Sequence, residues 1–289
     1  MLNRYTKELE PDEIIPIWFD KVFKLIFGDS NHLDRTKLLI SSVLKKDIDS
    51  LELLDNELIG DNRLDKINSV DLLAKIDDEY VHIEVNSSFG EVTRNRNLVF
   101  LFRVQSKQLK SGDSYRKLTK HYQINFNQED FDNEHINICH IKSENTGKIY
   151  SDFLEIYNIN VKHFADMCYN GIKEEMTPSM KLFALIGTDK KSVIDNIITN
   201  DNYLKEIGIM AKDFSSDDHI LMEYNKLDLL RADMEYEREK ELKEQAQEIT
   251  KKVTEQVTLD NAKKMIDAGI DIDIISKILN IPKDVLENL

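Results

Sequence analysis

Two acidic side chains lie in neighbouring apolar stretches that are predicted to form strands. Asp71 belongs to SVDLLAKI and Glu84 to YVHIEV, and the acidic residues Asp77–Glu79 between them predict a hairpin turn. Because strand residues alternate between the two faces of a sheet, Glu84 and Asn86 share one face. Asp71 reaches that face when it stands opposite Glu84 or Asn86, which requires an even number of loop residues.

Two carboxylates that converge on one face of a sheet repel each other, and each raises the pKa of the other. A divalent cation between them removes this repulsion. Mg²⁺ and Mn²⁺ prefer oxygen ligands, and Mg²⁺ is commonly held by one or two carboxylates together with a substrate phosphate. Such a metal activates water and stabilises a phosphoryl transition state, so the pattern indicates phosphoryl chemistry.

Positive charge is concentrated in one segment of an otherwise acidic chain. The formal net charge is −15, which by itself disfavours nucleic-acid binding, yet residues 94–120 hold eight basic residues against one acidic residue. Residues 93–110 have helical spacing. On that helix, the basic side chains that fall within an arc of roughly 60° are Arg96, Arg103, Lys107 and Lys110. Leu98, Phe102 and Leu109 lie opposite and are expected to pack, so the basic face either contacts phosphates or is simply solvated.

Hydrophobic periodicity predicts the elements that position these residues. Residues 17–48 are expected to form two helices, and residues 50–86 a meander of three short strands. The basic helix is expected to end at Ser111–Asp113, and residues 121–127 form a further strand. Residues 136–141 either extend this sheet or begin a separate strand pair.

The second half of the chain has a helical pattern. Helices are predicted over residues 151–170 and 177–200, the latter starting at Thr177–Pro178. Residues 223–258 carry ten acidic and seven basic residues without Gly or Pro, which indicates a long solvated helix. Gly269 precedes a closing pair of short helices.

Length and composition predict one domain with an extension. The chain has 289 residues, of which 41% are hydrophobic and 32% charged, enough to bury one good core. We expect a core over residues 1–145 and a helical subdomain over residues 146–222 that packs on the core. Residues 223–289 are expected to form a polar helical arm that ends in a short helical hairpin.

Composition also argues against several classes of protein. No run of about 18 apolar residues occurs, and residues 1–13 lack the pattern of a signal peptide, so we predict a cytoplasmic protein without a membrane segment. Cys139 and Cys168 are the two cysteines, and neither belongs to a CxxC motif. This spacing argues against a structural zinc site and fits a reducing compartment.

A series of short motifs, in order, resembles a known family. The motifs are FDKVFK at 19–24, IFG at 26–28, the Asp71 strand, IEVN at 83–86, Arg96 and QLKSGDSY at 108–115. Together they resemble the Rpn group, which comprises recombination-promoting nucleases and transposase-like proteins of the PD-(D/E)XK superfamily. The resemblance covers residues 18–127, and the DAG at 267–269 is similar to the tail of that family.

The resemblance implies an α/β (α+β) fold with a restriction-endonuclease-like core, in which helices flank a mixed central sheet and a helical extension follows. It implies a DNA endonuclease that depends on Mg²⁺ or Mn²⁺, with Asp71 and Glu84 as metal ligands. Relatives place a Lys or Gln two residues after the Glu to orient the attacking water, and Asn86 occupies that position here. Asp20 is the candidate for a further acidic ligand. The basic helix would then contact the DNA backbone.

Several alternatives stay open. Asn86 is one methylene shorter than Gln and lacks the charge of Lys, so a DNA-binding relative without turnover is a second interpretation. A third is an interaction protein that oligomerises through the arm, and a homodimer joined by residues 223–258 would bring two sites together. Asp20 has an alternative role in the first turn of its helix, where the dipole favours acids. His82 is interpreted as a packing or hydrogen-bonding residue.

Overall fold

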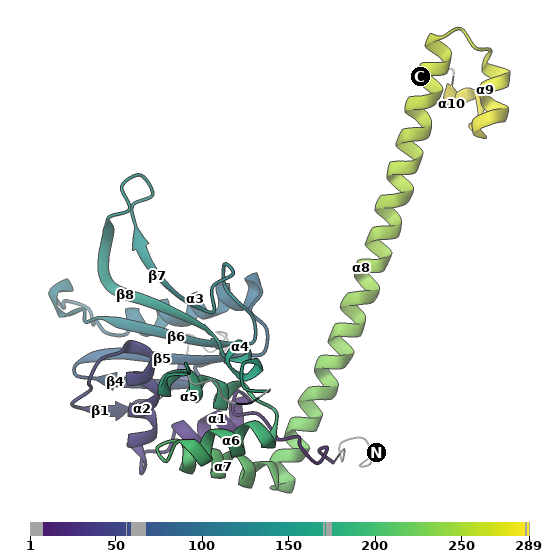
Figure 1. The fold of residues 1–289 in the computed structure, drawn as a ribbon. Helices are drawn as coiled ribbons and strands as arrows, with labels where there is room; N and C mark the ends of the chain where they lie inside the picture. The colour runs from purple at the N-terminus through teal and green to yellow at the C-terminus, as the bar shows by residue number, and fades with distance from the viewer. Residues whose placement is uncertain are drawn as a thin grey trace. The chain divides into compact units, whose positions relative to one another are not determined.

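The computed structural model describes residues 8–55, 57–58, 68–169, 171, 175–286 and 288 of the chain (Figure 1). The chain divides into two compact units, residues 1–225 and residues 226–289. The three-part division expected from the sequence stays a prediction.

The first unit contains a six-stranded mixed sheet in the order β1-β4-β5-β6-β8-β7. Its strands are β1 (Leu51–Leu53), β4 (Leu72–Ile76), β5 (Glu79–Asn86), β6 (His121–Asn127), β7 (Ile136–Lys142) and β8 (Ile149–Asn160). Neighbours β5, β6 and β8 run parallel, and the other pairs are antiparallel. β2 (Glu57–Leu58) and β3 (Asn68–Ser69) pair separately. The predicted mixed sheet and the meander β1-β4-β5 are therefore confirmed, although the first strand ends at Leu53 and residues 57–58 pair outside this sheet.

The β4–β5 hairpin has a two-residue loop. Asp77 and Asp78 both adopt positive φ, 44° and 72°, as expected for the hairpin turn whose twist matches that of the strands. Glu79 was expected in the turn but already pairs with Ile76 in the ladder. The register pairs Leu72 with Ile83, so its continuation places Asp71 opposite Glu84. The even loop length inferred from the sequence is confirmed.

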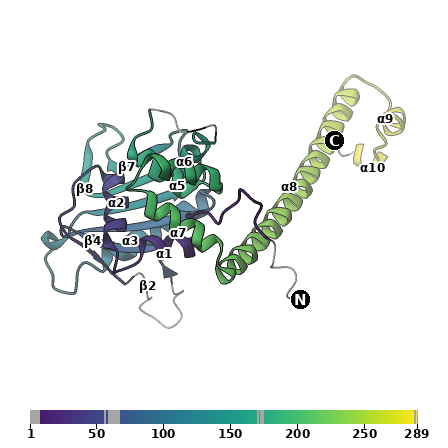
Figure 2. The same cartoon turned by 60° about the horizontal axis from the view of Figure 1, so that its bottom comes forward.

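Helices pack on both faces of the sheet (Figures 1 and 2). One face of the sheet and six helices form the main apolar core together. These helices are α1 (Asp20–Phe27), α2 (Leu33–Leu44), α4 (Val161–Asp166), α5 (Pro178–Gly187), α6 (Lys191–Asn200) and α7 (Lys205–Ser215). On that face the strands contribute buried side chains such as Ile83, Ile124 and Phe126. The opposite face packs on α3 (Glu91–Ser106), and the short 3-10 helix η2 (Tyr115–Lys117) precedes β6.

The face of the sheet that meets α3 is mostly polar. A small apolar cluster of Val70, Leu73, Phe100 and Val104 occupies one part of it. Elsewhere on this face the buried polar side chains are His82, Glu84, Asn86, His121, Gln123, Asn125, Asn127 and Asn158. Buried polar groups are stable only when they are hydrogen-bonded, so this face must be organised by side-chain contacts.

The helix predicted over residues 151–170 is wrong over most of its length. Residues 149–160 form β8, which pairs in parallel with β6 and antiparallel with β7. Pairing on both sides fixes this segment as a strand, although its charged and polar residues lack clear alternation. Helix α4 begins only at Val161, after Asn160 caps it by accepting from the N–H of His163. Residues 136–141 extend the sheet, because β7 pairs with β8.

The basic helix is shorter than predicted and packs on a different face. α3 ends at Ser106, so Lys110 lies beyond it. Its buried side chains are Asn97, Phe100, Leu101 and Val104. Phe102, expected to pack, is 57% exposed. The error arises because the polar sheet face selects Asn97 as an inward residue, which a hydrophobic pattern does not detect.

The helix predicted over residues 177–200 is interrupted: it forms α5 and α6, because the chain is extended at Thr188 and at Lys190 between them. Thr177 caps α5 with Pro178 in its first turn, as expected. α8 (Asp218–Asp267) continues from the first unit into the second, where α9 (Ile272–Leu279) and α10 (Lys283–Leu286) follow. Ala262, Ile275, Ile281 and Leu286 form a small core among them, which confirms the closing helical hairpin. Among the described residues, no helix has the length and apolar character to cross a membrane.

Candidate active site

Asp71 lies in a bend just before β4, beside the first turn of α1. Its Oδ2 accepts a hydrogen bond of 2.8 Å from the main-chain N–H of Val85. Its carboxyl also hydrogen-bonds that of Asp20. Nζ of Lys24 lies 2.6 Å from Oδ1 of Asp20 and 3.3 Å from Oδ1 of Asp71. Two charged side chains of α1, Asp20 and Lys24, thus meet the distant Asp71 at the start of β4.

Glu84 is buried beside Asp71, with 2% of its surface exposed. The main-chain N–H of Asp71 donates to its carboxyl. Oε2 lies 3.6 Å from Nη2 of Arg96. Oε1 is buried and has no hydrogen-bond partner among the described residues. A buried carboxylate oxygen without a donor is costly, so this atom requires a proton or a cation.

The surroundings of both acids favour their protonated forms. Burial, the hydrogen bond that the protonated Asp71 carboxyl donates to Asp20, and the charge of Asp20 raise the pKa of Asp71 to about 7. Burial and the charge of Asp71 raise the pKa of Glu84 well above its ordinary value, and Arg96 only partly opposes this. Burial lowers the pKa of Lys24, but its contacts with Asp20 and Asp71 outweigh burial and raise that pKa overall.

The acids fit a hard divalent cation that takes part of its coordination from elsewhere. Mg²⁺ is commonly bound by one or two carboxylates and completes its shell with water and substrate phosphate. Oε1 of Glu84 is available as such an oxygen ligand, because it has no hydrogen-bond partner within the part of the chain that the structure describes. Within the described part of the chain, no group of three or more His, Cys, Asp or Glu side chains is arranged to hold a metal alone. Substrate and water ligands are therefore needed to complete the shell.

Asn86 is fixed by its neighbours. Its Oδ1 accepts from Nη2 of Arg96 at 2.7 Å and from Nδ2 of Asn97 at 3.5 Å. Its Nδ2 donates to Oδ1 of Asn127 at 3.0 Å. Arg96 therefore bridges Glu84 and Asn86, and most of the hydrogen-bonding capacity of the amide is already used.

The four basic residues predicted to contact phosphates separate into two groups. Arg96 lies at the acids, and its guanidinium lies 5.7 Å from the ring centroid of Phe100. Arg103 has a buried Nη1 without a partner among the described residues. Lys107 is exposed at the C-terminal cap of α3, and Lys110 is exposed in the following loop. Arg96, Arg103 and Lys107 thus lie on α3 or at its cap and Lys110 lies beyond the helix, and their contact with phosphates stays a prediction.

The sequence analysis did not predict two contacts at the site. Lys24 joins both acids of the α1–β4 corner, and its i,i+4 spacing from Asp20 within FDKVFK was the available signal. Nδ1 of His82 lies 3.0 Å from Nε2 of His121, which confirms a hydrogen-bonding role for His82. Burial lowers the pKa of His121 to about 3, so this buried contact involves neutral rings.

Comparison with known proteins gives a family match. A family model described as PD-(D/E)XK nuclease family transposase matches residues 18–241. The searches of curated proteins and of solved structures found no significant match. The matched range includes Asp20, Lys24, Asp71, Glu84 and Asn86, together with every strand of the six-stranded sheet.

Proposed function

The chain belongs to the PD-(D/E)XK nuclease family of transposases, and from this premise we propose that it is a metal-dependent DNA endonuclease with Asp71 and Glu84 as metal ligands. Nucleases of this family generally use divalent metals, and their substrate is DNA. The observation that carries the proposal is the buried pair of carboxyls, in which Oε1 of Glu84 has no partner among the described residues and both pKa values are raised. Perturbed acids of this kind cluster at functional sites.

The two acids have distinct supports. The Val85 N–H fixes one oxygen of Asp71 and leaves the other near Lys24. Glu84 approaches from the neighbouring strand with Oε2 3.6 Å from Nη2 of Arg96, and its Oε1 has no hydrogen-bond partner among the described residues. When bound, Mg²⁺ or Mn²⁺ polarises a phosphate oxygen and lowers the pKa of a coordinated water. Asp20 contributes negative charge and holds Lys24 in place.

Lys24 and Asn86 divide the task of orienting the attacking water. Asn86 retains one N–H beyond its bond to Asn127, and this N–H is the group available to a water. Lys24 supplies the positive charge that Asn86 lacks, because its ammonium contacts both Asp20 and Asp71. Asn86 has a further role, since its oxygen holds Arg96 beside Glu84.

The basic residues would bind the DNA backbone at two places. Arg96 is half exposed at the acids, where a guanidinium can pair with a phosphate bidentately. Lys107 and Lys110 are exposed near the other end of α3, and Arg103 lies between the two places. Contacts to phosphate would give affinity and register without sequence preference.

The second candidate is a DNA-binding relative that does not cleave. Its supporting observation is that Arg96, Asn97 and Asn127 engage the amide of Asn86, so that this group has little freedom to follow a reacting water. In this case the basic residues keep their role and the carboxyls contribute metal binding only.

A homodimer through the long helix has separate support. Exposed apolar side chains follow α8 of the second unit at spacings of seven, four and four residues: Leu242, Ile249, Val253 and Val257. A stripe of this spacing is typical of a helix that pairs with another helix. Sedimentation at micromolar concentration tests this proposal, and a monomer there would contradict it.

Supercoiled plasmid with Mg²⁺ or Mn²⁺ tests the proposed function. Wild type should nick the plasmid, and Asp71→Ala and Glu84→Ala should not. Asp78→Asn is the matched control, because Asp78 lies in the same hairpin, is exposed and pairs only with Lys75 among the described residues, and Asn tolerates its positive φ. Absence of nicking by folded wild type that still shifts plasmid in a gel would instead favour the binding-only candidate.

A further inference from the structure

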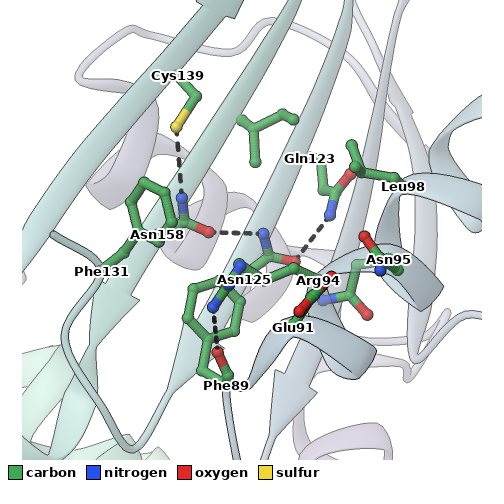
Figure 3. Close-up of a pocket in the computed structure, with 12 residues that line it drawn as sticks. Phe89, Glu91, Arg94, Asn95, Leu98, Gln123, Asn125, Phe131, Cys139 and Asn158 are labelled. Atoms are coloured by element: carbon green, nitrogen blue, oxygen red, sulfur yellow. Dashed lines mark hydrogen bonds between the residues drawn. The ribbon is translucent and has the colours of Figure 1, made fainter. Parts of the chain in front are cut away.

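A cavity of about 380 Å³ lies between α3 and the β6-β8-β7 side of the sheet (Figure 3). Its floor includes Gln123 and Asn125 of β6 and Asn158 of β8. Phe89, before α3, and Phe131, after β6, line it as well. A volume of this size is in the range of sites that hold small planar ligands.

The cavity is adjacent to the candidate active site because of the strand register. Glu84 pairs with Asn125, and Asn125 pairs with Asn158. With neighbouring strands about 4.8 Å apart, Asn125 lies about 5 Å and Asn158 about 10 Å from Glu84 along this row. Side chains connect the two places, since Nδ2 of Asn97 lies 3.0 Å from Oδ1 of Asn125 and 3.5 Å from Oδ1 of Asn86.

The floor of the cavity is a row of linked amides. Oδ1 of Asn125 accepts from Nε2 of Gln123 at 3.0 Å, and Nδ2 of Asn125 donates to Oδ1 of Asn158 at 2.9 Å (Figure 3). Nδ2 of Asn158 is left with a 3.7 Å contact to Sγ of Cys139. A thiol is a weak acceptor, and Oε1 of Gln123 is buried without a hydrogen-bond partner among the described residues. The Asn158 N–H and the Gln123 oxygen are therefore the donor and the acceptor of this row that a ligand could engage.

The wall of the cavity is aromatic and positively charged. The rings of Phe89 and Phe131 meet edge to face, with centroids 6.1 Å apart. The guanidinium of Arg94 lies within 5.9 Å of both ring centroids and donates at 2.9 Å to the carbonyl oxygen of Phe89. Arg94 is thereby fixed as part of the wall, with a flat face available for stacking.

We propose that this cavity binds an unpaired nucleobase of the substrate strand, next to the phosphate that the acids would cleave. This inference rests on the proposed function, because the proposed function supplies DNA as the substrate. Amides that present both donors and acceptors match the edges of bases, and aromatic or guanidinium planes match their faces. Phosphate is a poorer occupant, because Arg94 is already engaged and Glu91 adds negative charge to the lining.

An occupant of this kind defines the substrate class. A base in a duplex is stacked and paired, so it must leave the helix before it can enter an enclosed pocket. Single strands, bulges and mismatches lower the energy needed for this step. The protein is therefore expected to bind and cleave DNA with an unpaired base in preference to fully paired DNA.

Duplexes that contain 2-aminopurine, either paired or in a one-base bulge, test the proposal. Binding is measured by anisotropy and by the fluorescence of the analogue, in the Asp71→Asn background so that cleavage does not interfere. Cys139→Phe fills the cavity from β7, and Ile138→Phe is its matched control, because the neighbouring Ile138 faces the other side and is 47% exposed. Phe131→Ala removes part of the cavity wall and is the second test variant, used if Cys139→Phe does not fold.

The Asp71→Asn protein without a cavity-filling substitution, here the unfilled protein, should bind the bulged duplex more tightly than the paired duplex. It should also change the fluorescence of the unpaired analogue. Cys139→Phe or Phe131→Ala should weaken binding to the bulged duplex about tenfold, the effect expected for loss of one stacked base, and leave binding to the paired duplex unchanged. Ile138→Phe should behave as the unfilled protein. Equal binding of both duplexes, or equal effects of Cys139→Phe and Ile138→Phe, would overturn the proposal.

The outcomes separate the base pocket from the proposed function. Loss of bulge preference in Cys139→Phe, with a wild type that nicks no DNA, would support the pocket and refute the nuclease. Metal-dependent nicking that ignores both the bulge and the filling substitution would support the nuclease and refute the pocket.

Discussion

The main-chain N–H of Val85 holds Oδ2 of Asp71 at 2.8 Å, so a residue outside the strand is fixed at the register position opposite Glu84. This bond makes the pair of acids a property of the hairpin. The two-residue turn at Asp77–Asp78 sets the register, and the register sets the approach of the carboxyls. Their repulsion in a buried place then creates the demand for a cation.

Replacing Glu84 by its neutral isostere should separate stability from catalysis. Glu84→Gln removes a buried acid that repels Asp71, so the metal-free protein should melt a few degrees higher at pH 8. Cleavage should fall by about a hundredfold or more, because a metal ligand is lost. Thermal melting and nicking measure the two effects on one preparation. Asp78→Asn should change neither quantity, and a lower melting temperature for Glu84→Gln would contradict this reading.

The stability of the metal-free protein should decrease as the pH rises. The pKa of Asp71 is about 7 in the folded protein against an ordinary value of 3.8, so folding favours its protonated form. Its contribution to stability is therefore complete below about pH 4 and is lost as the pH rises through about 7. Mn²⁺ competes with this proton, so stabilisation by Mn²⁺ should grow over the same window. Melting curves from pH 5 to pH 8 test this, and metal stabilisation that does not vary with pH would refute it.

The charge of Lys24 should be needed for cleavage more than for folding. Lys24→Met keeps most of the side-chain length but removes the cation beside Asp20 and Asp71, so we expect about a hundredfold lower cleavage rate. Lys21→Met is the matched control on the same helix, because Lys21 pairs instead with Glu223 at 2.7 Å. Equal rates for the two variants would remove Lys24 from the proposed mechanism and leave the water to Asn86.

Salt dependence should report the phosphate contacts. Each phosphate neutralised on duplex DNA contributes about 0.9 to the slope of log affinity against log salt. The double variant Lys107→Ala and Lys110→Ala should therefore reduce the slope by about 2. Lys162→Ala with Lys191→Ala removes the same charge from exposed positions on α4 and α6. A similar reduction of the slope in both double variants would show that the salt dependence follows net charge alone.

The packing of α5 on the start of α4 should tolerate no side chain at Gly187. A Cβ there would lie 2.2 Å from the carbonyl oxygen of Val161, which is main chain and cannot yield easily. We expect Gly187→Ala to reduce the free energy of unfolding by about 3 kcal/mol or more. Gly90→Ala is the control, because nothing lies within 4 Å of the added methyl group. Chemical denaturation distinguishes them, and equal midpoints would contradict the packing described here.

Local patterns predicted those parts of the fold whose cause is local. The α1 and α2 helices, the two-residue turn and the cap at Thr177 all depend on neighbours in sequence. β8 was predicted as a helix because its strand state depends on pairing with β6 and β7, which are distant in sequence. The inward face of α3 was misassigned for a similar reason, since Asn97 is buried against amides of the sheet.

The sequence allowed the two acids of the candidate site to be predicted, but not the side-chain contacts around them. Asp71 and Glu84 followed from strand alternation together with the turn, and the structure brings them side by side. The contacts of Lys24 and the engagement of Asn86 by Arg96 depend on how α1 and α3 pack on the sheet. No sequence spacing determines that packing, so the cavity lined by Asn125 and Asn158 also had no signal in the sequence.

The most direct measurement is the single-turnover rate of DNA cleavage as Mn²⁺ is added to wild type and to Asp71→Asn. We expect the wild-type rate to rise from zero and saturate, and the Asp71→Asn rate to stay at least about a hundredfold lower at every concentration. Asp78→Asn should follow wild type. Equal rates for wild type and Asp71→Asn, or a wild-type rate that does not respond to the metal, would contradict the assignment of the site.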